Sequence, residues 1–189
     1  YIITSPNSIV LKEKVNISDL EGYNDGKWWV QDYAASLPVR LMGNVEGKNI
    51  LDMCAAPGSK TFQLINFGAN VIAYDKSKKR INIMKENAKR LKFKINIING
   101  DVAKYNTKKK FDIVLLDAPC SASGTIKRNP EILFRKKLPD INNLLKLQHM
   151  LLLKASKLLK NNGYIMYVVC SIFSKEGIIA ILKLTPIYI

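Results

Sequence analysis

Two cysteines of this chain each stand at the end of an apolar run. Cys120 lies within LLDAPCSASG, residues 115–124, and Cys170 lies within VVCSIF, residues 168–173. A cysteine thiolate is a strong nucleophile, so both residues are candidates for covalent catalysis. A structural interpretation is also open, because free cysteine often packs as a small buried hydrophobe.

Metal binding is another chemistry that cysteines suggest. Cys54, Cys120, Cys170 and the single histidine, His149, lack the closely spaced ligand pairs that zinc sites use, so we expect no metal. Three widely separated cysteines do not form a disulfide framework either. A reducing compartment, and hence a cytoplasmic location, is the expectation that follows.

Short apolar runs alternate with segments of helical periodicity along most of the chain. The predicted strands are residues 48–54, 70–75, 94–100, 111–117 and 163–170. The predicted helices are residues 60–67, 77–92, 141–160 and 175–184. Strict alternation of the two predicts an α/β fold, with a mostly parallel sheet covered by helices on both faces.

Such a sheet binds ligands at the carboxyl ends of its strands. Asp52, Asp75, Asp117, Cys120 and Cys170 all fall at or just past a predicted strand end. We therefore expect five polar or reactive side chains to gather on one rim. The alternative is that the short polar residues cap the helices that follow.

The turn DMCAAPGSKT, residues 52–61, joins a predicted strand to a predicted helix. It holds one glycine, Gly58, where a dinucleotide fold uses several, and it lacks the two-glycine pattern of a phosphate loop. Pro57 fixes the turn, Gly58 lets a ligand approach the backbone, and Lys60 adds positive charge beside the free amides of the helix start. A ligand with a carboxylate and a nucleoside would fit.

Two further aspartates support a nucleoside ligand. Asp75 ends the second predicted strand, where an acidic side chain can accept hydrogen bonds from ribose hydroxyls. Asp101, in NGDVAKY, follows the third strand and is placed to meet an adenine amino group.

The composition is that of one globular domain with an excess of basic residues. The 189 residues are 48% hydrophobic, no apolar stretch is long enough for a membrane span, and the formal charge is +15. The charge favours a nucleic-acid partner, although Lys, Asn and Ile together are also typical of an A/T-biased coding sequence. We expect residues 1–47 to form an extension or lid, with Trp28 and Trp29 in packing roles, and residues 48–189 to form the core.

Five stretches carry a resemblance to a known family. LDMCAAPGSKT, AYDKS, GDVAKY, LLDAPCSASGTIKRNPEI and GYIMYVVCS occur in the order and spacing of the motifs of the RNA 5-methylcytosine methyltransferases. GKWWVQDYAASLP is most similar to the bacterial branch that modifies small-subunit (16S) ribosomal RNA. The resemblance covers residues 5–189. It implies a Rossmann-like methyltransferase fold, S-adenosylmethionine as cofactor, and RNA as partner.

The resemblance also implies roles for single residues. Enzymes of this family add a cysteine thiolate to cytosine C6, which makes C5 electron-rich enough to take up a methyl group. By resemblance Cys170 is the nucleophile, Cys120 assists release of the product, and Asp117 holds the N3 or N4 edge of the ring. The implied cofactor-binding residues are Cys54, Ala55, Ala56, Pro57, Gly58, Ser59, Lys60, Asp75, Asp101 and Asp117.

Basic residues after the first cysteine loop are candidates for RNA binding. Lys127, Arg128 and Arg135 could meet phosphates, and a solvated protein surface is the alternative.

The chain departs from the family pattern at several points. Val169 stands where the family usually has Thr, and the common Glu-Asn pair is Glu176-Gly177. The N-terminal helical RNA-binding region and two final strands of the sheet are absent, so we expect a sheet truncated at its C-terminal edge, in a fragment or a shortened gene product. Three alternatives stay open: a non-catalytic RNA-binding remnant, a tRNA 5-methylcytosine methyltransferase, and a methyltransferase for a small molecule or protein.

Overall fold

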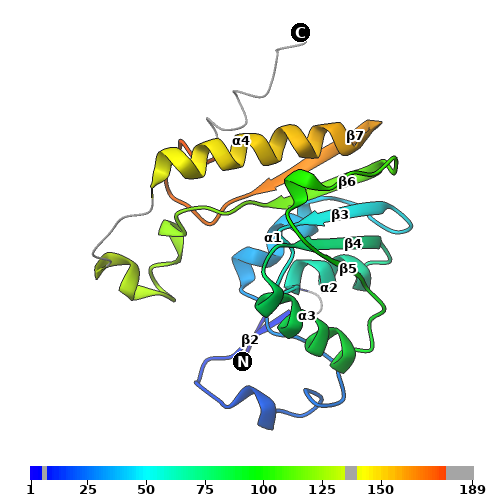
Figure 1. The fold of residues 1–189 in the computed structure, drawn as a ribbon. Helices are drawn as coiled ribbons and strands as arrows, with labels where there is room; N and C mark the ends of the chain where they lie inside the picture. Colours follow the sequence, from blue (N-terminus) through cyan, green and yellow to red (C-terminus); the bar gives the residue numbers. More distant parts are fainter. Residues whose placement is uncertain (6–7, 135–139, 178–189) are drawn as a thin grey trace.

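A computed structural model describes residues 1–5, 8–134 and 140–177 of the chain. Its centre is a five-stranded sheet in the order β5-β4-β3-β6-β7, in which every pairing is parallel (Figure 1). The strands are β3 (Asn49–Met53), β4 (Asn70–Asp75), β5 (Asn96–Asn99), β6 (Phe111–Asp117) and β7 (Leu159–Val168). The predicted α/β class and all five predicted strands are confirmed.

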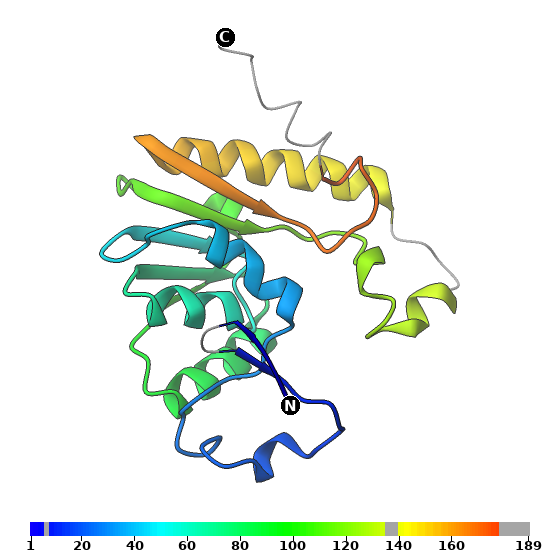
Figure 2. The ribbon, with the colours of Figure 1, turned by 180° about the vertical axis from the view of Figure 1, so that it is seen from behind.

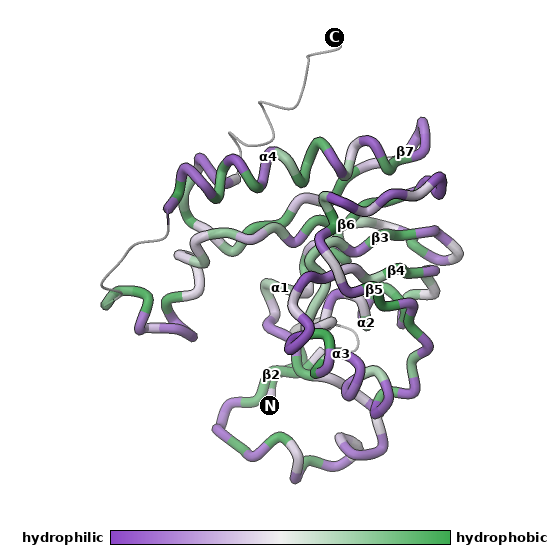
Figure 3. The backbone as a smooth tube through the Cα atoms, in the orientation of Figure 1, coloured by the Kyte–Doolittle hydropathy of each residue, from purple (hydrophilic) through white to green (hydrophobic). Residues whose placement is uncertain are grey.

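Helices cover both faces of this sheet, as predicted. α1 (Tyr33–Leu41), α2 (Ser59–Asn66) and α3 (Lys78–Arg90) pack on one face, whereas α4 (Ile141–Leu158) and the 3-10 turn η2 (Val102–Lys104) pack on the other. Figure 2 shows the same layers from behind, with α4 running beside β6 and β7. Along α4, hydrophobic and hydrophilic residues alternate with the turns of the helix (Figure 3), so one side of it can face the sheet.

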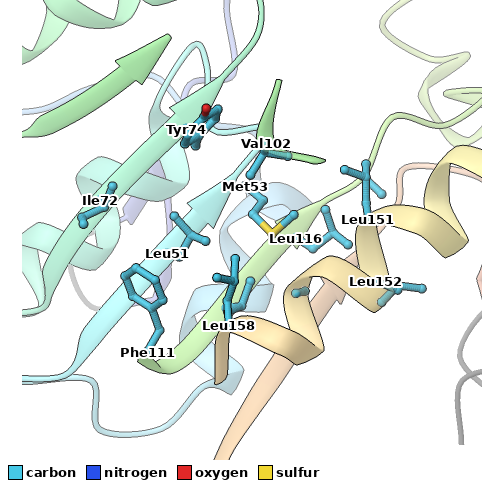
Figure 4. Close-up of a cluster of buried hydrophobic side chains, with 13 residues drawn as sticks. Leu51, Met53, Ile72, Tyr74, Val102, Phe111, Leu116, Leu151, Leu152 and Leu158 are labelled. Atoms are coloured by element: carbon cyan, nitrogen blue, oxygen red, sulfur yellow. The ribbon is translucent and has the colours of Figure 1, made fainter. Parts of the chain in front are cut away.

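Alternation along each strand divides the hydrophobic core into two layers. Leu51, Met53 and Leu116 point toward α4, where they contact a layer that includes Leu152 and Leu158 (Figure 4). Their sequence neighbours point the other way, toward α1 and α2. Because successive side chains of a strand face opposite sides, these apolar runs can bury both faces of the sheet.

The border between α4 and β7 differs from the prediction. The helix ends at Leu158 rather than at residue 160, and β7 begins directly at Leu159 rather than at residue 163. Phe111 pairs with Leu159 and Ile113 with Tyr164, so the start of β7 bulges out of register. The start of this strand, residues 159–163, is LKNNG, which has the composition of a turn, and for this reason the sequence predicts a later start. Of the predicted helix 175–184, residues 175–177 form a turn and the remainder lies outside the described residues.

The N-terminal segment begins with a short antiparallel hairpin, β1 (Ile2–Ser5) and β2 (Ser8–Val10), followed by the 3-10 turn η1 (Ile17–Asp19). The Trp29 ring packs edge-on against Phe62 and Phe93, which agrees with the predicted packing role. The division of the chain at residues 47 and 48 stays a prediction. None of the helices in the described part of the chain is long and apolar enough to cross a membrane.

The strand order creates a switch point between β3 and β6. From β3 the chain moves outward to β4 and β5, and then returns to the other side of β3 to form β6 and β7. Loops that leave β3 and β6 therefore diverge at their carboxyl ends, which is where sheets of this kind bind ligands. The segment after β6 projects beyond these strand ends in both ribbon views (Figures 1 and 2).

Candidate active site

The loop between β3 and α2 is held in one conformation by Gly58. This residue caps α2 with a φ of +109°, and its carbonyl oxygen accepts a hydrogen bond from the Phe62 amide. A Cβ atom at position 58 would lie 2.7 Å from Phe62 Cζ and 2.8 Å from Met84 Cγ. Only glycine fits both the backbone angle and this space, so the loop runs close to the helix face.

Asp75, the last residue of β4, has a carboxylate that already has several partners. It accepts hydrogen bonds from the backbone amides of Ala56 (3.0 Å) and Ser77 (2.7 Å) and from the guanidinium of Arg80 (3.0 and 3.2 Å). Its side chain is 1% exposed, whereas that of Arg80 is 49% exposed. Asp75 therefore directly fixes the loop between β3 and α2, residues 54–58, which we call the cofactor loop because the sequence assigns it to cofactor binding. Arg80 is the partner that a ligand can displace most easily.

A pocket lies between the ends of β4 and β5 and the side of α4. Its lining brings together three residues that sequence reasoning assigned to cofactor binding, Cys54, Asp75 and Asp101, with apolar atoms around them. The other lining residues are Tyr74, Lys76, Arg80, Gly100, Val102, Pro119, Leu147 and Leu151. Asp101 also caps η2 by accepting the Ala103 amide, so for this aspartate the capping interpretation holds as well.

Lys60 and Asp117 connect the two strands of the switch point. Lys60 Nζ lies 2.8 Å from Asp117 Oδ2, and the side chains are 11% and 35% exposed. Because Lys60 lies in the first turn of α2, which follows β3, and Asp117 ends β6, the ion pair lies across the point where the loops diverge. Asp117 is thus on the rim, as predicted.

Asp52 lies beneath the rim rather than on it. Its side chain is fully buried, and one oxygen accepts a hydrogen bond of 2.5 Å from Thr61 Oγ1. The other oxygen, Oδ1, has no partner among the described residues. Burial raises the pKa of Asp52 to about 7, and the Thr61 hydrogen bond offsets only part of that shift. We therefore assign Asp52 to the support of the loop and not to ligand contact.

Cys120 and Cys170 meet although 50 residues separate them. Their sulfur atoms lie 3.3 Å apart, and Cys170 is exposed. Hydrogen bonding from the Cys120 thiol lowers the pKa of Cys170 to about 7, and the same contact raises the pKa of Cys120. The pair therefore favours one thiolate, on Cys170, and one thiol, on Cys120. Such a thiolate can act as a nucleophile near neutral pH.

The third cysteine behaves differently. Burial raises the pKa of Cys54 to about 12, so this residue stays a thiol at neutral pH. Its backbone adopts a φ of +63° at the start of the cofactor loop. That its backbone matters more than its sulfur for cofactor binding stays a prediction.

Glu176 is a residue of this site that sequence reasoning missed. Its buried carboxylate accepts hydrogen bonds from Ser121, Ser171 and Gln148. Burial alone would raise its pKa, but these hydrogen bonds more than compensate, so the pKa is lowered. In the sequence, Glu176 stands six residues after Cys170, at the glutamate of the Glu-Asn pair that is common in the family.

Contacts made by backbone amides also connect the two cysteine loops, which are the segment after β6 that holds Cys120 and the segment after β7 that holds Cys170. The Gly124 amide donates to the Cys170 carbonyl oxygen (3.0 Å), and the Ile172 amide donates to Ser123 Oγ (3.1 Å). A Cβ at position 124 would lie 3.2 Å from the Cys170 carbonyl oxygen, which leaves little room for a larger residue.

The predicted RNA-binding residues lie on the surface beside these loops. Lys127 and Arg128 are exposed, and Arg128 Nε lies 3.4 Å from Asp32 Oδ2. Arg135 lies outside the described residues. The ion pair neutralises part of the charge of Arg128. The role of Lys127 and Arg128 in RNA binding stays a prediction.

The fold and the rim together define a Rossmann-like methyltransferase fold. The crystal structure of PH0851 matches 92% of this chain with a TM-score of 0.86 and 33% sequence identity, over 42% of that structure. The crystal structure of NSun6 from Pyrococcus horikoshii with SFG matches 90% of the chain with a TM-score of 0.80 and 31% identity, over 45% of that structure.

A family model described as 16S rRNA methyltransferase RsmB/F matches residues 39–185, so the chain belongs to this family. A relative from Cronobacter sakazakii (strain ATCC BAA-894), named Ribosomal RNA small subunit methyltransferase B, is 39% identical over 96% of this chain. The chain spans 44% of that relative, which is less than half of its length. The predicted family is thereby confirmed.

S-adenosylmethionine is the cofactor of this family, as predicted. The residues of this chain fit such a ligand. α2 begins directly after the loop, Lys60 places a cation in its first turn, and the pocket lined by Asp75 and Asp101 has the mixed apolar and acidic lining that a nucleoside requires.

Proposed function

We propose that this chain is the catalytic part of an enzyme that methylates C5 of a cytosine in RNA, with 16S ribosomal RNA as its substrate. The observation that carries the proposal is the pair of cysteine sulfurs, 3.3 Å apart, just past the carboxyl ends of β6 and β7. A methyltransferase for a small molecule or protein would use the same cofactor loop, but it would have no need for two paired thiols. Its cysteines and a ribosomal RNA substrate would place the enzyme in the cytoplasm.

The cofactor would be held by residues on both sides of β3. The loop backbone at residues 54–58 and Lys60 suit its carboxylate, whereas Asp75 and Asp101 suit its nucleoside. When bound, S-adenosylmethionine supplies an activated methyl group on a sulfonium.

The protein's own part in the reaction begins with Cys170. Its thiolate adds to C6 of the cytosine, which moves electron density to C5. Asp117 holds the N3 or N4 edge of the ring and stabilises charge that develops there, and its ion pair with Lys60 fixes its direction.

Release of the product requires two bonds to break. After C5 has gained the methyl group, it gives up its proton to solvent water, the electron pair of that bond re-forms the double bond between C5 and C6, and the bond between C6 and Cys170 breaks to return the thiolate. Cys120 assists at this stage, because its sulfur lies 3.3 Å from the leaving sulfur.

The reaction is tested by following labelled methyl groups from S-adenosylmethionine into transcripts of 16S ribosomal RNA, with transfer RNA as the competing substrate. Digestion to nucleosides should yield 5-methylcytidine from the ribosomal transcript, and Cys170→Ala should abolish it. Label in another nucleoside, or undiminished label with Cys170→Ala, would refute the proposed chemistry. Preferential labelling of transfer RNA would refute the proposed substrate.

A non-catalytic RNA-binding remnant is the second candidate, supported by the charge of +15. It is separated from the enzyme by calorimetric titration with S-adenosylhomocysteine. Saturable binding that Asp75→Ala loses supports the enzyme, because Asp75 holds the cofactor loop. Folded protein that binds RNA with a steep salt dependence but shows no heat with S-adenosylhomocysteine supports the remnant.

A further inference from the structure

We propose that Glu176 is a positioning residue whose buried carboxylate holds Cys120 and Cys170 within reach of each other. Ser121 follows Cys120 directly in the chain, and Ser171 follows Cys170 directly. Both serine hydroxyls donate hydrogen bonds to Glu176 Oε2, of 2.6 Å from Ser121 and 2.5 Å from Ser171. One carboxylate oxygen therefore joins the two loops one residue away from each sulfur.

The second oxygen of the carboxylate extends the same connection. Glu176 Oε1 accepts the Ser121 amide (2.9 Å) and Gln148 Nε2 (3.0 Å), and Gln148 also donates to the Pro119 carbonyl oxygen (2.9 Å). Gln148 is fully buried in α4. The contact between the cysteine loops is thus anchored to a helix of the core.

Four converging donors require a carboxylate rather than an amide at this position. Each oxygen of Glu176 accepts two hydrogen bonds, whereas a glutamine would present one oxygen and an NH2 group that is itself a donor. A fully buried charge is stable only when hydrogen bonds replace its lost hydration. The four hydrogen bonds therefore require the negative charge of Glu176, and this charge is stable when buried because the four donors surround it.

Little regular structure fixes the two loops without this carboxylate. β6 ends at Asp117 and β7 ends at Val168, so both cysteines lie beyond the ladder that pairs these strands. The loops are joined there by the serine cluster and by single backbone contacts such as that from Gly124 to Cys170. Loss of the carboxylate should let the sulfur atoms separate.

Positioning and plain electrostatics make opposite predictions for the acidity of Cys170. If Glu176 acted only as a nearby negative charge, neutralising it would favour the thiolate and lower the pKa of Cys170. If Glu176 instead keeps the Cys120 thiol where it donates a hydrogen bond to Cys170, neutralising Glu176 removes this hydrogen bond and raises the pKa of Cys170. The sign of the change separates the two roles.

The inference deepens the proposed function and rests on it, because a nucleophile and an assisting thiol are the groups that are held together. It is tested on the whole chain by measuring the rate of iodoacetamide alkylation of Cys170 against pH, with peptide mass spectrometry to distinguish the three cysteines. Asp112→Asn is the matched control. Asp112 lies near the opposite end of β6, where its carboxylate accepts the Asn49 amide and pairs with Lys160.

The unchanged protein should show a Cys170 transition near pH 7. Glu176→Gln should raise this transition by about one pH unit or more, toward the ordinary cysteine value, and Asp112→Asn should leave it in place. An unchanged or lowered transition in folded Glu176→Gln protein would overturn the proposal. An ordinary transition in the unchanged protein would overturn it as well.

Ser171→Ala provides the same test should Glu176→Gln fail to fold, as judged by circular dichroism. This variant removes one hydroxyl from the carboxylate and keeps the charge, so it should raise the transition by a smaller amount. No rise would overturn the proposal. Because alkylation needs neither RNA nor cofactor, a correct shift without any methylation of RNA would refute the proposed function and leave the positioning role of Glu176 standing.

Discussion

The cofactor loop and the cysteine loops lie on the same rim but are held in place in different ways. The cofactor loop spans the turn between β3 and α2, where Gly58 and the buried Asp75 fix a compact strand-turn-helix unit. The cysteine loops leave β6 and β7 and meet through side-chain hydrogen bonds centred on Glu176.

Because of this difference, substitutions in the two halves of the site should have different effects. Backbone shape and packing determine the cofactor side, so a change there should cost stability and ligand binding together. A few polar contacts between segments 50 residues apart determine the cysteine side. A change there should alter reactivity more than stability, because only the separation of two sulfur atoms has to change.

The largest effect is expected from Gly58→Val on the cofactor side. A β-branched residue at a φ of +109° would be strained and would collide with Phe62 and Met84. We expect a loss of roughly 3–4 kcal/mol in the free energy of unfolding by urea, together with the loss of S-adenosylhomocysteine binding.

Gly43→Val is the matched control for this change. Gly43 also has a positive φ, of +74°, but a Cβ there would meet no atom within 4 Å in the part of the chain that the structure describes. It should cost only the backbone strain, about 1–2 kcal/mol, and should leave ligand binding intact. Equal losses in the two variants would show that packing at Gly58 does not shape the loop.

The pH dependence of stability should sharpen the comparison through Asp52. The unfolded chain ionises this residue near pH 4, whereas the folded protein holds the proton to about pH 7, so the folded state binds more protons and loses stability as the pH rises between these values. Between pH 5 and pH 8 the unchanged protein should lose roughly 2–3 kcal/mol relative to Asp52→Asn.

Urea unfolding at both pH values measures this difference, and Asp112→Asn serves as the control. Hydrogen bonding from Lys160 lowers the pKa of Asp112, so its contribution is present above the unfolded pKa and is lost only in acid. The control should therefore shift stability equally at pH 5 and pH 8. If the free energies of unfolding of the unchanged protein and Asp52→Asn differed by the same amount at pH 5 and pH 8, the buried carboxyl of Asp52 would be ionised at both pH values.

A smaller effect on stability is expected from Gly124→Ala in the cysteine loops. Its Cβ would lie 3.2 Å from the Cys170 carbonyl oxygen, so Cys170 must move by a few tenths of an ångström. We expect less than about 1 kcal/mol in unfolding but roughly a tenfold loss in kcat of methyl transfer. Gly177→Ala, where a Cβ meets no atom of the described residues within 4 Å, should change neither quantity. A stability loss as large as that of Gly58→Val would erase the contrast between the two loops.

The smallest effect concerns the basic surface beside the cysteine loops. Lys127→Gln should reduce the slope of log affinity for single-stranded RNA against log salt by about 0.7, as expected for one phosphate contact. Arg128→Gln should reduce it by less, because Arg128 is paired with Asp32. Fluorescence anisotropy over a range of salt concentrations measures both slopes, and unchanged slopes would assign this surface to solvent.

The sequence was most informative where local pattern determines structure. Apolar runs that end in Asp75 and Asp117 located strand ends, and the single Gly58 located the cofactor turn, since each depends on a few adjacent residues. The burial of Asp52 could not be predicted, because it depends on how Thr61 and the next helix fold back over the strand.

The contacts of Glu176 escaped prediction for a similar reason. The residue lies past the last predicted strand, and its partners Ser121 and Gln148 belong to distant segments that meet only in the folded chain. The start of β7 was misplaced because a bulge of polar residues has the composition of a turn.

The most direct test of the central claim is to trap the covalent adduct between the protein and RNA. Cys120→Ala protein is incubated with S-adenosylmethionine and a 16S ribosomal RNA transcript and then run on a denaturing gel, beside the double variant Cys120→Ala, Cys170→Ala. An RNA-bound band of reduced mobility in the single variant and its absence in the double variant are the predicted result. A band that persists without Cys170, or no band in folded protein that binds both cofactor and RNA, would contradict the assignment of Cys170 as nucleophile and Cys120 as the group that assists release.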